Sequence, residues 1–198
     1  MLNFRNTNIL FFILLVLLIS ANYFIGIPLF AYALLVIAYL GILAYGSYKV
    51  SLNFYMPVLC SAKTRDKEIA ISFDDGPDAE ITPAILTILN RANVHAAFFL
   101  IGNRIPDREI LVRKLYEEGH LIGNHSFSHH ALFDFFSSRK MGEDLKSMDQ
   151  LIINMLGIRP RLFRPPYGVT NPNLKSAVQA GGYKSIGWSI RSLDTVIK

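Results

Sequence analysis

The sequence predicts an α/β domain with a parallel sheet, preceded by two membrane-spanning helices. From Glu68 onward, short apolar runs of strand length alternate with segments of helical spacing, which is the order of elements in parallel α/β folds. Before Asp66 there is no acidic residue, and from Asn8 to Ser47 there is no charge of either sign. Long uncharged apolar runs are typical of membrane spans.

The apolar N-terminal region is longer than one bilayer crossing, which needs about 20 helical residues. Gly26-Ile27-Pro28 is the natural break, because glycine and proline interrupt helices and proline fits a helix start. We therefore expect an anchor over residues 1–50, with transmembrane helices at about 8–25 and 28–47. The alternative is a signal peptide with Arg5 as its basic region, although no clear small-x-small cleavage site follows it.

The rest of the 198-residue chain has room for about one domain of ordinary size. Its net charge of +5 is dispersed, with basic and acidic residues interspersed over 63–68 and 107–118. Nucleic-acid binders usually show a basic stripe or a recognised module, so we expect no nucleic-acid partner. The single cysteine, Cys60, cannot form an internal disulfide and is expected to be a small apolar residue near the membrane interface.

Residues 51–67 are expected to be a connector, and the α/β domain is expected to begin at Glu68. The first strand is Ile69–Phe73, and Thr82 before Pro83 has the pattern of an N-cap followed by proline at the first helical position. The other expected strands are 96–102, 120–125, 161–163 and 183–188, and the expected helices are 83–92, 108–118, 143–156 and 172–180.

A pair of acids follows the first strand, in SFDDGPD (72–78). Parallel-barrel enzymes place their chemistry at the carboxyl ends of strands. Asp74 and Asp75 are adjacent carboxylates that repel each other, a cost that a metal ion would relieve. Successive strand residues point to opposite sides, so the two acids can have different roles. A solvated acidic turn is the alternative.

A histidine cluster, HSFSHH (125–130), follows the third strand. His125 and His129 are four residues apart, so on a helical turn both imidazoles would face one metal ion. Neutral imidazole suits zinc and similar divalent ions, and a third ligand from an acid would leave positions open for water. The alternative is a structural pair; structural or supporting roles are expected for His120 and His130.

A rigid loop, RPPYG (164–168), follows the fourth strand. Two prolines fix its backbone, so the loop could direct a backbone N–H at a developing oxyanion. Arg164 could hold a carboxylate in a fixed geometry. By itself the motif could also be a simple turn.

Together, SFDDGPD, then HSFSH about 50 residues later and RPPYG about 35 residues after that, resemble the motifs of the polysaccharide deacetylase family (carbohydrate esterase family 4, the NodB-homology domain). AAFFLIG and EEGHLIGNH resemble its connecting segments, so the resemblance extends from about Glu68 to Asp194. It implies a distorted, incomplete (β/α) barrel with an open groove that suits a sugar chain.

The resemblance implies a role for each matching residue. Asp74 matches the general base of the family. Asp75, His125 and His129 match its Asp-His-His metal triad, which usually holds zinc and sometimes cobalt or nickel.

Two further catalytic residues and part of a fourth motif match as well. Arg164 matches the arginine that orients the base, and the backbone N–H of Tyr167 matches the oxyanion donor. Trp188 and Asp194 lie where the family has its fourth motif. The family often has Asp-Trp there, whereas Thr195 follows Asp194 in this chain, so the match of Asp194 is looser.

The implied activity is metal-dependent hydrolysis that removes acetyl groups from an N-acetylated amino-sugar polysaccharide or oligosaccharide. An acetylated glycan and membrane lipid are the expected partners. One alternative is an O-acetyl glycan esterase of the same family. Another is a catalytically inactive, truncated membrane protein.

The resemblance also calls for a fifth motif, an apolar strand with a histidine that serves as general acid. The sequence ends at Lys198 and has no histidine after His130. We therefore expect the domain, over 68–198, to be incomplete at its C-terminus, with little activity and poor stability alone.

The expected location is the cell membrane, with a multi-pass anchor. Arg5 and Lys49 flank the predicted hairpin and its turn carries no charge, so the positive-inside rule places both flanks in the cytoplasm. Most cell-surface polysaccharides lie outside the cell. The sequence leaves the side of the catalytic domain open.

Overall fold

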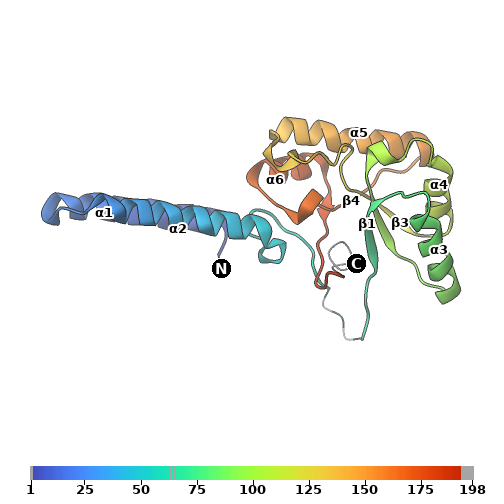
Figure 1. Cartoon of the computed structure of the whole chain (residues 1–198), viewed down its shortest axis with the longest axis horizontal. Helices are drawn as coiled ribbons and strands as arrows, with labels where there is room; N and C mark the ends of the chain where they lie inside the picture. Colours follow the sequence, from blue (N-terminus) through green and yellow to red (C-terminus); the bar gives the residue numbers. More distant parts are fainter. Residues whose placement is uncertain (1, 63, 65, 193–198) are drawn as a thin grey trace.

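The computed structural model describes residues 2–62, 64 and 66–192. A long helical hairpin extends from one side of an α/β domain (Figure 1). Its helices are α1 (Phe4–Ile25) and α2 (Leu29–Tyr48), which meet at Gly26. Gly26 has a φ of 63°, a left-handed conformation that glycine adopts readily.

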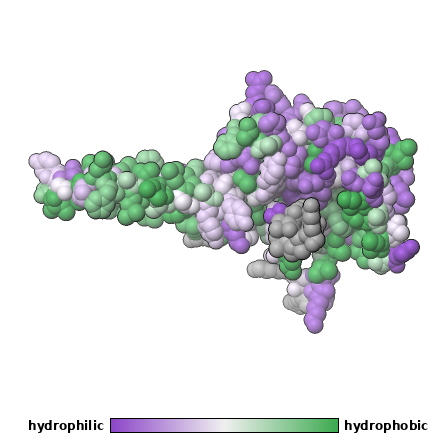
Figure 2. Space-filling view, viewed as in Figure 1, coloured by the Kyte–Doolittle hydropathy of each residue, from purple (hydrophilic) through white to green (hydrophobic). Residues whose placement is uncertain are grey.

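Both hairpin helices are long and apolar enough to cross a membrane, with mean hydropathies of 2.3 and 2.1. This property rests on length and composition, and a signal sequence near the N-terminus would share it. Hydrophobic residues cover most of the hairpin, whereas the visible face of the domain is mostly hydrophilic (Figure 2).

The base of the hairpin packs directly on the α/β domain. The backbone N–H of Thr170 donates to the Ser47 carbonyl over 3.0 Å, and the Ser47 hydroxyl donates to the Thr170 carbonyl. Gly46 lies so close to the Phe54 ring that an added Cβ would stand 2.4 Å from it. Part of the predicted connector is therefore packed structure. It includes the short helix η1 (Val50–Leu52) and the buried residues Phe54, Tyr55, Met56 and Val58.

Five parallel strands form the sheet, in the order β1-β2-β3-β4-β5. This confirms the predicted α/β class. The strands are β1 (Ser72–Gly76), β2 (Ala97–Leu100), β3 (Leu121–Asn124), β4 (Leu162–Phe163) and β5 (Lys184–Ser185).

The first strand lies three residues later than predicted. The strand β1 contains both aspartates, whereas the prediction ended it at Phe73. Its register with β2 shifts between Phe73 and Gly76, and Asp75 has a φ of 64°. The apolar run Ile69–Phe73 misled the prediction because pairing with β2 continues through the polar residues that follow it.

Four helices cover the sheet: α3 (Ile81–Ala92), α4 (Glu109–Glu117), α5 (Ser138–Leu156) and α6 (Pro172–Gly181). The helix α6 lies on the side of the hairpin, and α3 and α4 lie on the far side (Figure 1). The helix α5 begins five residues before the predicted start, because the Ser137 hydroxyl accepts a hydrogen bond from the Lys140 N–H and caps it.

The predicted N-cap at Thr82 is wrong. The helix α3 begins at Ile81, and the Asp78 carboxylate accepts hydrogen bonds from the backbone N–H groups of Glu80 and Ile81 at 2.9 and 2.7 Å. The Thr82 hydroxyl instead accepts from the Asp78 N–H at 2.9 Å. An ionised carboxylate is the stronger acceptor for free N–H groups at a helix start.

Two buried apolar clusters fix the strands to the helices. One joins α3, α4 and α5 to the sheet through residues such as Phe98, Leu115 and Met148. The other joins the hairpin base and α6 to α5 through residues such as Val50, Leu145 and Phe163. Burial of each such side chain stabilises the fold by roughly 1.5–3 kcal/mol. This packing fixes the sheet, whose parallel strands all end at the same edge.

Candidate metal site and its neighbours

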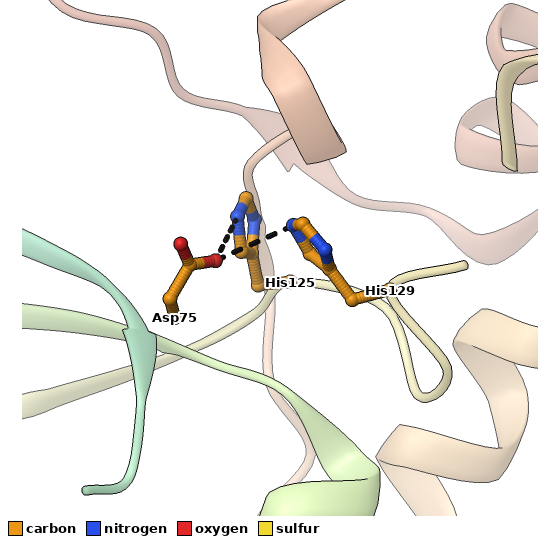
Figure 3. Close-up of side chains that lie close together, drawn as sticks. All are labelled: Asp75, His125 and His129. Atoms are coloured by element: carbon orange, nitrogen blue, oxygen red, sulfur yellow. Dashed lines mark ion pairs between the residues drawn. The ribbon is translucent and has the colours of Figure 1, made fainter. Parts of the chain in front are cut away.

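Asp75, His125 and His129 converge at the carboxyl edge of the sheet (Figure 3). The Asp75 Oδ1 atom lies 3.4 Å from His125 Nε2 and 3.3 Å from His129 Nε2. The side chain of His125 is 4% exposed, whereas that of Asp75 is 49% exposed. The cluster is therefore closed on the protein side and accessible on the other.

These three side chains fit a divalent cation. Ligand atoms about 2.0–2.1 Å from a tetrahedral ion stand about 3.3–3.4 Å apart, close to the separations between Asp75 and the two imidazoles. Those separations are long for hydrogen bonds, and Asp75 Oδ1 is buried without a hydrogen-bond partner among the described residues. An imidazole, imidazole and carboxylate set is a common donor set for zinc and similar ions.

The electrostatics favour the ligating forms of these groups. The adjacent His125 imidazole lowers the pKa of the Asp75 carboxyl, and burial opposes this effect. Burial, together with the proximity of His125, lowers the pKa of His129 below its ordinary value of 6.5. Near pH 7 the carboxylate is thus ionised and the His129 imidazole neutral, as metal binding requires.

The predicted helical turn under the two histidines is wrong. Residues 125–131 form an irregular loop in which Ser126 has a φ of 71° and His129 a φ of 43°. The imidazoles meet because the chain bends back, with ring centroids 5.0 Å apart. Spacing alone suggested the convergence, but not the left-handed residues that produce it.

Arg164 holds Asp74 beside this cluster. Its Nη1 atom lies 2.6 Å from Asp74 Oδ1 and 2.8 Å from the Ser72 hydroxyl. Its other nitrogens donate to the Ile186 and Gly187 carbonyls at 3.3 and 3.0 Å. The guanidinium is 4% exposed, so its geometry, and that of the Asp74 oxygen, is firmly set.

The loop after β4 lies against the histidines. Tyr167, in the short helix η4 (Pro166–Gly168), has a φ of 57°. Its hydroxyl donates to the His129 carbonyl at 3.2 Å, and its ring centroid is 4.7 Å from that of His129. A Cβ at Gly168 would stand 2.3 Å from the Trp188 ring. Trp188 thus forms part of the wall behind this loop, and Asp194 lies outside the described residues.

His120 and His130 each accept a hydrogen bond from a backbone N–H group, which agrees with supporting roles. His120 is buried, and its Nδ1 accepts from the Ala96 N–H at 3.2 Å. His130 Nδ1 accepts from the Leu132 N–H at 3.0 Å.

The single cysteine is not a candidate nucleophile. Burial raises the pKa of the Cys60 thiol, which disfavours a reactive thiolate.

Sequence reasoning missed the residues that support the histidines from α5. Asp144 accepts a hydrogen bond from the Phe127 N–H, between the two histidines, and the buried Asp149 accepts one from the Asn124 side chain just before His125. Asp149 follows Met148 and Leu145 on the buried side of α5. An acid on an apolar helix face was the signal available in the sequence.

The fold and the site together define an α/β protein with a candidate metal centre and an arginine-held carboxylate at the carboxyl edge of a parallel sheet. The polysaccharide deacetylase family matches residues 61–186. This chain belongs to that family. The parallel sheet agrees with the predicted α/β class, and the structure brings Asp75, His125 and His129 together.

Among known relatives, a Bacillus cereus peptidoglycan-N-acetylglucosamine deacetylase is 35% identical over 127 residues, 64% of this chain and 46% of the relative. The Bacillus subtilis peptidoglycan-N-acetylmuramic acid deacetylase PdaA is 31% identical over 66% of this chain and 50% of its own length. A crystal structure of a peptidoglycan N-acetylglucosamine deacetylase superposes with a TM-score of 0.66 at 31% identity, covering 75% of this chain and 68% of the other. The chain spans about half the length of these two curated relatives.

Proposed function

We propose that this chain is a metal-dependent hydrolase that removes acetyl groups from N-acetylated amino sugars of peptidoglycan, with Zn²⁺ held by Asp75, His125 and His129. The observation that carries the proposal is the position of this three-ligand group beside Asp74, whose carboxylate is bound to Arg164 over 2.6 Å. The relatives named as peptidoglycan deacetylases support the substrate class.

Different residues of the proposed site would carry out different steps of amide hydrolysis. Asp75, His125 and His129 would hold a divalent ion, which would supply Lewis-acid activation of the acetyl carbonyl and of water. Arg164 holds Oδ1 of Asp74, which leaves the other carboxylate oxygen to take a proton from the attacking water as general base. The backbone N–H of Tyr167 stabilises the developing oxyanion. The C–N bond then breaks as the proton taken up by Asp74 passes to the amine nitrogen, and the acetic acid that leaves ionises to acetate.

Amide rather than ester hydrolysis is favoured by the names of the relatives, which are N-acetylglucosamine and N-acetylmuramic acid deacetylases. The three motifs do not separate the two reactions. Parallel assays on N-acetylated chito-oligosaccharide, peptidoglycan fragments and O-acetylated xylan distinguish them. Faster acetate release from O-acetylated xylan than from the N-acetylated substrates would contradict this proposal and favour an O-acetyl glycan esterase.

We also propose that the hairpin α1–α2 anchors the domain in a membrane through two spans, with lipid as its partner. Its apolar surface supports this placement. Resistance to extraction by alkaline carbonate is expected, and release into the carbonate supernatant would contradict it. Reporter fusions after Lys49 identify the side of the membrane on which the domain lies.

The test of the chemistry compares Asp74→Asn with Glu143→Gln in the full chain loaded with Zn²⁺. Asp74→Asn should keep its Zn²⁺ but lose acetate release by 100-fold or more, on the order of a lost general base. Glu143 is an exposed acid of α5 paired with Arg139, so its substitution should change neither quantity. Near-full activity of Asp74→Asn would show that the base is another group.

A further inference from the structure

The loop from His125 to His129, the histidine loop, has a backbone that depends on its surroundings. Ser126 and His129 adopt left-handed conformations, each of which costs a non-glycine residue on the order of 1–3 kcal/mol. The loop belongs to neither helix nor strand. Contacts from outside must therefore hold the shape that brings its two imidazoles together.

Asp144 of α5 binds the middle of the histidine loop. Its Oδ1 accepts from the Phe127 N–H at 2.7 Å, and its Oδ2 accepts from the Ser128 N–H at 3.2 Å. Hydrogen bonds to an ionised carboxylate are roughly twice as strong as neutral ones. Consecutive N–H groups around a left-handed residue form a concave anion site, which here is filled by a side chain of the protein itself.

Asn124 and Ser126 bind the two ends of the loop. Asn124 Oδ1 accepts from the Ser126 N–H at 2.8 Å, and the Ser126 hydroxyl accepts from the His129 N–H at 2.9 Å. Asn124 is fully buried, and its Nδ2 donates to the Leu145 carbonyl and to Asp149 Oδ1 at 2.9 and 3.0 Å. All four backbone N–H groups from 126 to 129 thus donate to side-chain oxygens.

The carbonyl side of the loop rests on the short helix η2 (Gly102–Arg104), which follows β2. The N–H of Gly102 donates to the Ser126 carbonyl at 3.1 Å, and that of Asn103 donates to the Phe127 carbonyl at 2.9 Å. The Asn103 side chain donates to the Ser128 carbonyl at 3.1 Å. The loop is thereby held between η2 and α5, with Asp144 as the charged contact.

We infer that Asp144 is a positioning residue of the metal site, with Asn124 and Ser126 as its neutral counterparts. By fixing the backbone between the two histidines, Asp144 keeps both Nε2 atoms 3.3–3.4 Å from Asp75 Oδ1. Partners that orient metal ligands commonly change metal affinity 10–100-fold when removed. The inference rests on the proposed metal site and assigns a role to a residue that touches neither ion nor substrate.

The experiment titrates Zn²⁺ alone, with a competing chelator, into the detergent-solubilised full chain. Asp144→Asn should raise the Kd for Zn²⁺ by about 10–100-fold, while circular dichroism of the metal-free protein is unchanged. Glu143→Gln is the matched control, because it removes the same charge from the adjacent residue of α5, and its Kd should equal that of the wild type. Hydrogen exchange over 126–129 should accelerate in Asp144→Asn without metal.

A second pair of variants keeps the test decisive if Asp144→Asn does not fold. Ser126→Ala removes the acceptor for the His129 N–H and should weaken Zn²⁺ binding by about 10-fold. Ser128→Ala is its control, since the buried Ser128 hydroxyl has no hydrogen-bond partner within the described part of the chain.

The outcomes separate this inference from the proposed activity. Unchanged Zn²⁺ affinity in Asp144→Asn, or in Ser126→Ala if the first variant does not fold, overturns the positioning role even if the melting temperature falls. A wild-type chain that binds no Zn²⁺ overturns the metal site and this inference together. Weakened Zn²⁺ binding in a chain that releases no acetate from any glycan supports the positioning role and contradicts only the deacetylase proposal.

Discussion

His125 and Arg164 are joined by a hydrogen bond between the His125 imidazole and the main chain. The Nδ1 atom of His125 lies 2.8 Å from the Arg164 carbonyl oxygen, while the Arg164 side chain holds Asp74. A carbonyl oxygen can only accept, so Nδ1 is the donor, and in the neutral imidazole Nε2 is then the free nitrogen that faces Asp75. One residue therefore orients both a candidate metal ligand and the candidate base.

Loss of the Arg164 side chain should affect stability and catalysis together. In Arg164→Gln, the Asp74 carboxylate loses the guanidinium that holds it at 2.6 Å, so acetate release should fall. The hydrogen-bond acceptors left without this guanidinium should lower the free energy of unfolding by about 1–3 kcal/mol, measured in urea. Arg164→Lys, which keeps the charge but not the geometry, should lose less acetate release. Unchanged acetate release in both variants would separate Arg164 from the base.

Zn²⁺ affinity should depend on pH through His129. Protons compete with metal for the imidazole nitrogen, and burial lowers the pKa of His129 below 6.5. The affinity should therefore stay nearly constant above about pH 6.5 and fall as the pH drops through the lowered pKa. Chelator competition between about pH 5 and pH 8 measures this. A steep rise in affinity between about pH 7 and pH 8 would mean that a ligand is still protonated there.

Asp134 should destabilise the fold at neutral pH. Burial raises the pKa of this carboxyl to about 6, and its Oδ1 has no hydrogen-bond partner among the described residues. The unfolded chain releases its proton near pH 3.8 and the folded chain only near pH 6, so stability falls as the pH rises across that interval. Asp134→Asn should stabilise the protein by about 1 kcal/mol at pH 7, because the carboxyl is half-buried and partly screened. It should have almost no effect at about pH 4.

Thermal melts of Asp134→Asn at both pH values test this expectation. Asp107→Asn serves as the control, since it removes an acid at an exposed site with a φ of 66° that asparagine tolerates. Equal effects of Asp134→Asn on stability at pH 4 and pH 7 would show that ionisation of its carboxyl does not cause the lower stability at neutral pH.

Gly168 should be indispensable for the loop beside the histidines. Its φ is 67°, and a Cβ there would stand 2.3 Å from Trp188, so Gly168→Ala should lower the free energy of unfolding by about 1–3 kcal/mol. Trp188 is the only tryptophan, so its fluorescence reports displacement of the ring. Gly142→Ala, in α5 with open space around it, should instead be neutral or stabilise by up to about 1 kcal/mol. A stable Gly168→Ala variant with wild-type fluorescence would show that the loop can shift freely.

The sequence by itself determined the alternation of strands and helices, the apolar hairpin and the residue types at the site. These features are local: hydrophobic period, glycine and proline breaks, and polar residues after apolar strands are written in consecutive residues. They placed the acidic pair and the histidines at one edge because parallel strands end at one edge of a sheet. The choice of Asp75 rather than Asp74 as the third candidate ligand came from the resemblance to the polysaccharide deacetylase family.

Only the tertiary structure decided how those residues meet. Asp144 holds the middle of the histidine loop, and the imidazole of His125 is oriented by a carbonyl 39 positions later in the chain. The start of α3 depends on the Asp78 carboxylate, which accepts from the Ile81 N–H, while the Thr82 hydroxyl accepts from the Asp78 N–H. Each of these outcomes follows from distances and free hydrogen-bonding groups that exist only once the chain is packed. The sequence motifs could therefore indicate candidate ligands but not the geometry that holds them.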